Sequence, residues 1–215
     1  MAWVKSMSRS RVALGRERFV GPVGGYGEAW PFSGVENTKT GVWIFLASDV
    51  VLFGAFIGSY IFLRVASPGG WAGWESIVHD PIPGLMNTYI LLTSSFTVVL
   101  AMIAAQKRSR LGLVAALTAT LLLGIGFLGN KGIEWYHLFH QGHWLSSSTE
   151  ASTFFLTTGL HGAHVIGGLI VTIYLIARAW NGAYMGDDST VEYFGLYWHF
   201  VDIVWLFLFP LFYIL

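Results

Sequence analysis

The stretch that decides the fold is residues 85–105, LMNTYILLTSSFTVVLAMIAA, which carries no charged side chain. An α-helix rises about 1.5 Å per residue, and about 20 apolar residues cross the hydrocarbon core of a bilayer. Residues 85–105 therefore predict a transmembrane helix. Four other segments have the same character, so the sequence predicts five spans; the others are residues 41–63, 111 to about 137, 151–177 and 193–215.

The overall composition is that of a membrane protein. Hydrophobic residues make up 54% of the chain and charged residues only 11%, whereas about 25% of a soluble domain is charged. The net charge of zero gives no bulk attraction to nucleic acid, which is not an expected partner. The absence of cysteine excludes disulfides, zinc–thiolate sites, iron–sulfur clusters and thiolate-bridged copper. We expect an all-α, polytopic membrane protein.

Lysine and arginine are unevenly distributed around the predicted spans. With the N-terminus inside, only Arg64 and Lys131 lie on the outer side, and the other basic residues lie on the inner side. The positive-inside rule therefore predicts an inner N-terminus and an outer C-terminus. Residues 1–40 form a basic cytoplasmic arm, which either lies near anionic headgroups or docks on a partner subunit. Residues 41–215 form the five-helix transmembrane domain.

Ionisable residues also lie inside the predicted spans, at similar depth. Such groups are costly in hydrocarbon and are expected to face protein. Mutual hydrogen bonding is the cheapest arrangement, so we expect Asp49 beside His164, and His199 beside Asp202 or a partner helix. We call the whole set the intramembrane polar cluster; its members are Asp49, His161, His164, His199 and Asp202.

Three roles for the intramembrane polar cluster are open. It can fix helix packing, handle protons beside a proton-pumping partner, or ligate haem or metal. Ligation is the weakest of these, because His161 and His164 share one helix and only His199 stands on another. Packing is the favoured role, and we expect no metal site and no catalytic residue in this chain.

Polar residues near the span ends suggest further contacts. Glu134 is three residues from Lys131 and can pair with it along one helix face. Arg178 ends the fourth span and can reach a phosphate headgroup or act as a simple anchor. We expect lipid binding at Arg178 and Glu134. His137, His140 and His143 favour an interfacial role over a surface metal site.

Several motifs resemble subunit III of haem–copper oxidases. Residues 158–165, TGLHGAHV, are similar to its penultimate helix, and residues 197–207, YWHFVDIVWLF, to its last helix. Residues 87–94, NTYILLTS, and Glu134-Trp135-Tyr136 resemble two further family segments. The resemblance covers about residues 40–215 in order, and residues 1–40 match no family segment.

Two departures from the family pattern matter. Many members have seven helices, and this chain resembles the five-helix form that lacks the first two. In the long form those two helices make half of a lipid-filled cleft, which is open here or completed by another chain. The family often has a Ser-Glu pair in its first shared helix, where this chain has Ser48-Asp49. In having Asp at this position, the chain resembles the quinol-oxidase branch of the family.

The resemblance implies a non-catalytic subunit of a proton-pumping terminal oxidase that reduces oxygen to water. The chain would carry no cofactor of its own, with haems and copper in partner subunits. It would contact subunit I directly, assemble with subunit II and other small subunits, bind phospholipid, stabilise subunit I and support proton uptake. The implied location is a prokaryotic plasma membrane rather than the mitochondrial inner membrane.

Other functions stay open at this point. The chain could be a membrane haem or electron-transfer anchor, or a relative of subunit III that serves nitric oxide reductase. A small transporter would show a repeat between its halves, and none is visible. The electron donor, cytochrome c or a quinol, is decided by subunit II rather than by this sequence.

Overall fold

The fold is a set of five long helices. The computed structural model describes residues 37–67, 71, 81–184 and 189–214. The described residues form no strand, and their helices are α1 (Asn37–Ala66), α3 (Ile82–Gln106), α4 (Arg110–His140), α5 (Thr149–Trp180) and α6 (Ser189–Tyr213). All five are long and apolar enough to cross a membrane. This confirms the predicted all-α class and the five spans. The predicted arm of residues 1–40 lies outside the described residues, except for its last four, which begin α1.

Each helix begins before its predicted apolar core, and all but α6 also end beyond it; α6 ends at Tyr213, where the prediction ran to residue 215. Ser109 caps α4 and Ser148 caps α5, each accepting a hydrogen bond from a backbone N–H three residues ahead. Such caps satisfy N–H groups that the helix itself cannot pair. The turns that follow α4 and α5 contain Gly142 and Gly182 at φ of 86° and 83°, where glycine has no Cβ to clash.

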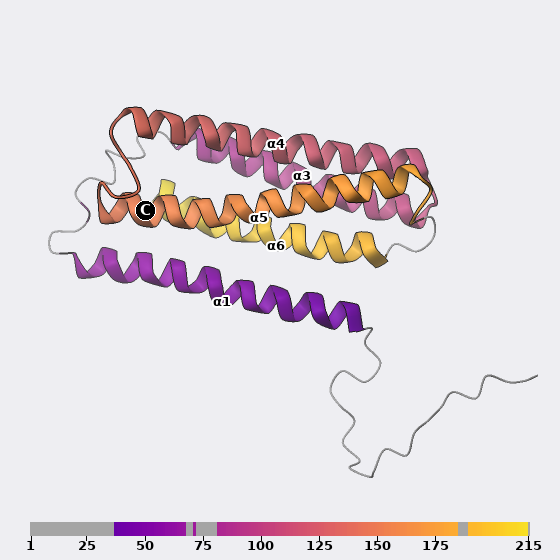
Figure 1. Ribbon diagram of the computed structural model, residues 1–215, viewed down its shortest axis with the longest axis horizontal. Coiled ribbons are helices and arrows are strands. Elements are labelled where there is room, and N and C mark those ends of the chain that lie inside the picture. Colours follow the sequence, from indigo (N-terminus) through magenta and orange to yellow (C-terminus); the bar gives the residue numbers. More distant parts are fainter. Residues whose placement is uncertain (1–36, 68–70, 72–80, 185–188, 215) are drawn as a thin grey trace, which may run out of the picture. The chain divides into compact units, whose positions relative to one another are not determined.

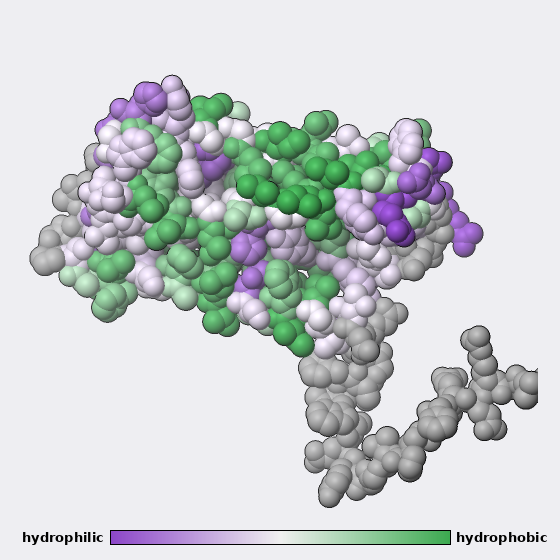
Figure 2. Space-filling model, viewed as in Figure 1, coloured by the Kyte–Doolittle hydropathy of each residue, from purple (hydrophilic) through white to green (hydrophobic). Residues whose placement is uncertain are grey.

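Four of the helices pack closely together. α3 lies along α4 and α6, and α5 lies along α4 and α6 (Figure 1). α1 has fewer neighbours and touches mainly α5 and α6. In the most apolar part of α6, 50% of the residues are buried, against 17% in α1. In the space-filling view, hydrophobic residues cover much of the middle of the visible face, and hydrophilic residues gather at both ends (Figure 2).

Large aromatic side chains of α6 fill the space between it and the neighbouring helices, and small residues make room for them. Trp198 and Trp205 are almost completely buried. A Cβ added to Gly168 would lie 2.5 Å from the Trp198 ring, so a larger residue there would force the ring or a helix to shift. Gly54 and Gly58 on α1 differ, because a Cβ at either position would meet no described atom within 4 Å.

Candidate functional site: the intramembrane polar cluster

The predicted partners His199 and Asp202 are joined through a third residue. Ser95, on α3, has its hydroxyl 2.8 Å from Nδ1 of His199 and also hydrogen-bonded to Oδ2 of Asp202. The i,i+3 spacing predicts that both α6 residues lie on one face of the helix, but it does not predict the bridge by Ser95. Serines in membrane helices commonly bond to their own backbone, and Ser94 beside it does so, bonding to the Leu91 carbonyl. Sequence alone gives no signal that distinguishes the bridging Ser95 from the backbone-bonded Ser94.

The second expected pair lies between α1 and α5. Nε2 of His164 is 3.6 Å from Oδ2 of Asp49, as the sequence predicts. Nδ1 of His164 donates to the carbonyl of Leu160 at 2.9 Å, which orients the ring along its own helix. The Tyr197 hydroxyl donates to the His164 carbonyl at 2.8 Å. This corner therefore ties α1, α5 and α6 together.

His161 occupies a separate and wholly buried position. Its Nε2 donates to the Val201 carbonyl of α6 at 3.1 Å, and its ring lies 5.2 Å from that of Trp205 and 5.5 Å from that of Phe127. Nδ1 has no hydrogen-bond partner among the described residues. The five residues thus form three small groups at three helix interfaces. Within the described part of the chain, no three His, Cys, Asp or Glu side chains are placed to hold a metal ion.

A buried ion pair lies near the end of α4. Lys131 Nζ lies 3.1 Å from both carboxylate oxygens of Glu134, the pairing that their spacing predicts. Tyr213 of α6 completes the group, since it accepts from Lys131 and donates to Glu134 at 2.6 Å. The ammonium also lies 4.6 Å from the centre of the Phe154 ring. This inward geometry ties α4 to α6 through a buried ion pair.

The other proposed lipid residue, Arg178, lies exposed at the end of α5. Its guanidinium is 6.0 Å from the Tyr174 ring centre. It also bonds to Tyr184 in the following turn: burial raises the pKa of that phenol, and the nearby arginine opposes the rise. At the end of α4, His140 Nδ1 donates to the Tyr136 carbonyl at 3.0 Å, and the two rings lie 4.1 Å apart.

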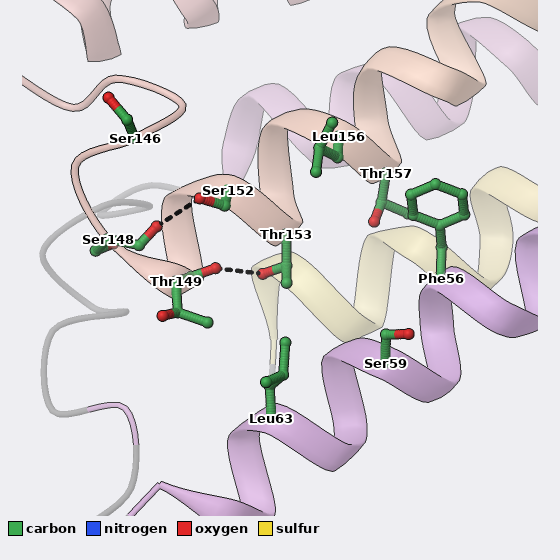
Figure 3. Close-up of a pocket in the computed structure, with 10 residues that line it drawn as sticks. All are labelled: Phe56, Ser59, Leu63, Ser146, Ser148, Thr149, Ser152, Thr153, Leu156 and Thr157. Carbon is green, nitrogen blue, oxygen red and sulfur yellow. Dashed lines mark hydrogen bonds between the residues drawn. The ribbon is translucent and has the colours of Figure 1, made fainter.

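A pocket of about 540 Å³ lies between α1 and the start of α5 (Figure 3). No motif in the sequence indicates it. Thr157 is 1% exposed, and its hydroxyl has no hydrogen-bond partner among the described residues. No ionisable side chain lines the pocket; its walls are Phe56, Ser59, Leu63, Ser146, Ser148, Thr149, Ser152, Thr153, Leu156 and Thr157.

Comparison with known proteins gives one consistent result. The family model "Cytochrome c oxidase subunit III" matches residues 23–215, so the match reaches into the segment that the motifs leave unassigned. A "Probable cytochrome c oxidase subunit 3" of Nocardia farcinica is 37% identical over 81% of this chain and 86% of that protein. A "Cytochrome bo(3) ubiquinol oxidase subunit 3" of Pseudomonas aeruginosa is also 37% identical, over 83% and 85%.

A third relative is longer than this chain. The "Heme-copper oxidase subunit I+III" of Aeropyrum pernix is 35% identical over 88% of this chain, and the chain spans 24% of that protein. The family model covers most of the chain, and the two shorter relatives match along most of their own length. This multi-pass membrane protein belongs to the cytochrome c oxidase subunit III family.

Proposed function

We propose that this chain is the non-catalytic subunit III of a proton-pumping haem–copper terminal oxidase. The observation that carries the proposal is the family match over residues 23–215, together with relatives named as subunits of both cytochrome c and quinol oxidases. Relatives of both kinds are 37% identical. The electron donor is therefore a property of the other subunits.

The proposed direct partner is subunit I, which this chain stabilises. The relative named as subunit I+III supports this, since its name assigns both subunits to one polypeptide. Subunit II and small subunits complete the proposed complex. The haems and copper belong to those partners; in the described part of this chain, no three His, Cys, Asp or Glu side chains are placed to hold a metal ion.

The proposed topology has residues 1–40 and the N-terminus inside and the C-terminus outside a prokaryotic plasma membrane. The charges on the described helices agree with this orientation. The short turn between α3 and α4 carries Lys107, Arg108 and Arg110, and Arg178 lies at the same end of the bundle, because α5 runs antiparallel to α4. Lys131 is buried in its ion pair. At the opposite end of the described helices from Arg178, the remaining flanking cation is therefore Arg64.

Phospholipid binding is proposed at two places. At one end of α5, exposed Arg178 supplies a cation for a phosphate group. At the other end, the hydroxyl-rich pocket beside α1 offers hydrogen-bonding groups next to apolar walls (Figure 3). The chain then supports proton uptake indirectly, by holding subunit I and its lipid in place, while the intramembrane polar cluster fixes helix packing.

Purification of the tagged full chain from its native membrane in mild detergent tests this function. We expect a complex that contains haem and copper, consumes oxygen and includes a larger catalytic subunit. Recovery of a monomer that is active by itself would contradict the proposal. So would a Soret band of the isolated chain that disappears when His164 or His199 is replaced.

A further inference from the structure

The Ser95 hydroxyl stands between an imidazole and a carboxyl group. It contacts Nδ1 of His199 and Oδ2 of Asp202 at hydrogen-bonding distance. A hydroxyl has one proton to donate and lone pairs to accept. Two hydrogen bonds therefore require a second proton, which sits either on Nδ1 of His199 or on Oδ2 of Asp202.

The surroundings of Asp202 disfavour a bare carboxylate. The residue is 4% exposed and lies in the middle of α6. None of the ion pairs among the described residues includes it, and its Oδ1 has no hydrogen-bond partner there. An unpaired charge in apolar surroundings is strongly destabilising. The group of three residues is therefore most stable when its net charge is zero.

Among the described residues, no other charged side chain is bonded to this group, and on α4 Lys131 and Glu134 bond to each other and to Tyr213. α3 has no charged side chain from residue 82 to residue 106. On α5 the ionisable groups within the span are His161 and His164, which bond to the Val201 and Leu160 carbonyls. On α1, Asp49 faces His164 and Lys39 pairs with Glu192.

We propose that Ser95, His199 and Asp202 form a binding site for one exchangeable proton, with Ser95 as the bridge. In one form, Asp202 is a carboxylic acid that donates to Ser95, and Ser95 donates to Nδ1 of a neutral imidazole. In the other, the Asp202 proton has moved to Ser95 and the Ser95 proton to His199, which gives a carboxylate and an imidazolium. Both forms have the same atoms, the same total charge and both hydrogen bonds.

His199 is the side from which this proton exchanges. It is partly exposed, whereas Asp202 is almost completely buried. A proton that reaches the imidazole can pass to the carboxyl group through the hydroxyl without movement of heavy atoms. The site goes beyond the proposed function, because a packing network needs neither a bound proton nor its exchange.

Infrared spectroscopy of the full chain in lipid, with ¹³C-labelled aspartate, tests the site. We expect a protonated carboxyl C=O band at neutral pH that is lost in D202N and kept in D49N, the matched control. H199N should shift this band when Ser95 is present and leave it unmoved in S95A. If H199N shifts the Asp202 band again in the S95T background, but not in the T93A/S95A background, the shift is assigned to the hydroxyl at residue 95.

The same spectra can overturn the site. Absence of a protonated Asp202 band at neutral pH in the unmodified chain would show that no proton is bound there. If H199N shifts the band equally with and without the Ser95 hydroxyl, Ser95 does not connect His199 to Asp202. Retention of the helical circular dichroism spectrum in each variant separates these outcomes from misfolding. The readout is Asp202 protonation itself, so it does not depend on whether an oxidase co-purifies.

Discussion

α1 and the bundle of α3–α6 are held in different ways. The bundle is packed by buried tryptophans against small residues, as at Gly168 and Trp198. α1 keeps most of its surface exposed and is joined at separate points, including Asp49 to His164 and the Tyr60 hydroxyl to the Leu211 carbonyl at 2.9 Å. Lipid supplies no hydrophobic drive between helices. The bundle is therefore held by many buried contacts, whereas α1 is held by fewer, which include the buried rings of Phe53 and Tyr60.

The largest expected effect comes from the buried ion pair inside the bundle. Lys131→Met leaves the Glu134 carboxylate buried without its cation and should destabilise the chain by about 3–5 kcal/mol. SDS-induced unfolding in mixed micelles, followed by circular dichroism, measures it. Lys39→Met is the control in α1, where the pair with Glu192 is about 40% exposed and its loss should cost about 1 kcal/mol or less. Similar losses of unfolding free energy in both variants would contradict the expected difference between the bundle and α1.

Overpacking of the helix contacts should have the next largest effect. Gly168→Val places methyl groups against the Trp198 ring and should cost about 1–3 kcal/mol in unfolding free energy. Gly58→Val is the matched change on α1, where a Cβ meets open space, and it should be close to neutral. The two variants are compared by the same unfolding titration. A larger loss from Gly58→Val would mean that α1 is packed more tightly than the bundle.

The hydroxyl of Tyr60 should account for a smaller share of stability. Tyr60→Phe removes the bond from α1 to the Leu211 carbonyl and should cost about 0.5–1.5 kcal/mol. Limited proteolysis after residue 66 should then proceed faster, because α1 separates more easily. Tyr89→Phe, at an exposed tyrosine of α3, provides the control and should leave the rate unchanged.

The helices were predictable because their apolar runs are long and uninterrupted, as in residues 85–105. Their ends were not, because caps such as Ser109 are polar residues outside the apolar run. The pair of Asp49 and His164 follows from depth and hydrogen-bond demand. The bridge by Ser95 and the third member of the ion pair, Tyr213, depend on how helices rotate against each other. One sequence gives no direct measure of that rotation.

Asp49→Asn should have the smallest effect. Asparagine keeps the size of the side chain, and Oδ2 of Asp49 makes no hydrogen bond among the described residues, so assembly should persist. In the purified oxidase, the ratio of protons pumped to electrons transferred should stay nearly unchanged. A large drop in this ratio with all subunits present would mean that α1 carries proton traffic rather than a packing contact.

The most direct test is to map side chains that face lipid. The central claim is that the ionisable residues inside the spans face protein. A carbene-generating lipid photolabel, applied to the chain in its native membrane and located by mass spectrometry, should modify exposed positions such as Phe62 and Ile170. It should leave Asp202 and His161 unmodified. Labelling of Asp202 or His161 at the level of Phe62 would contradict the account.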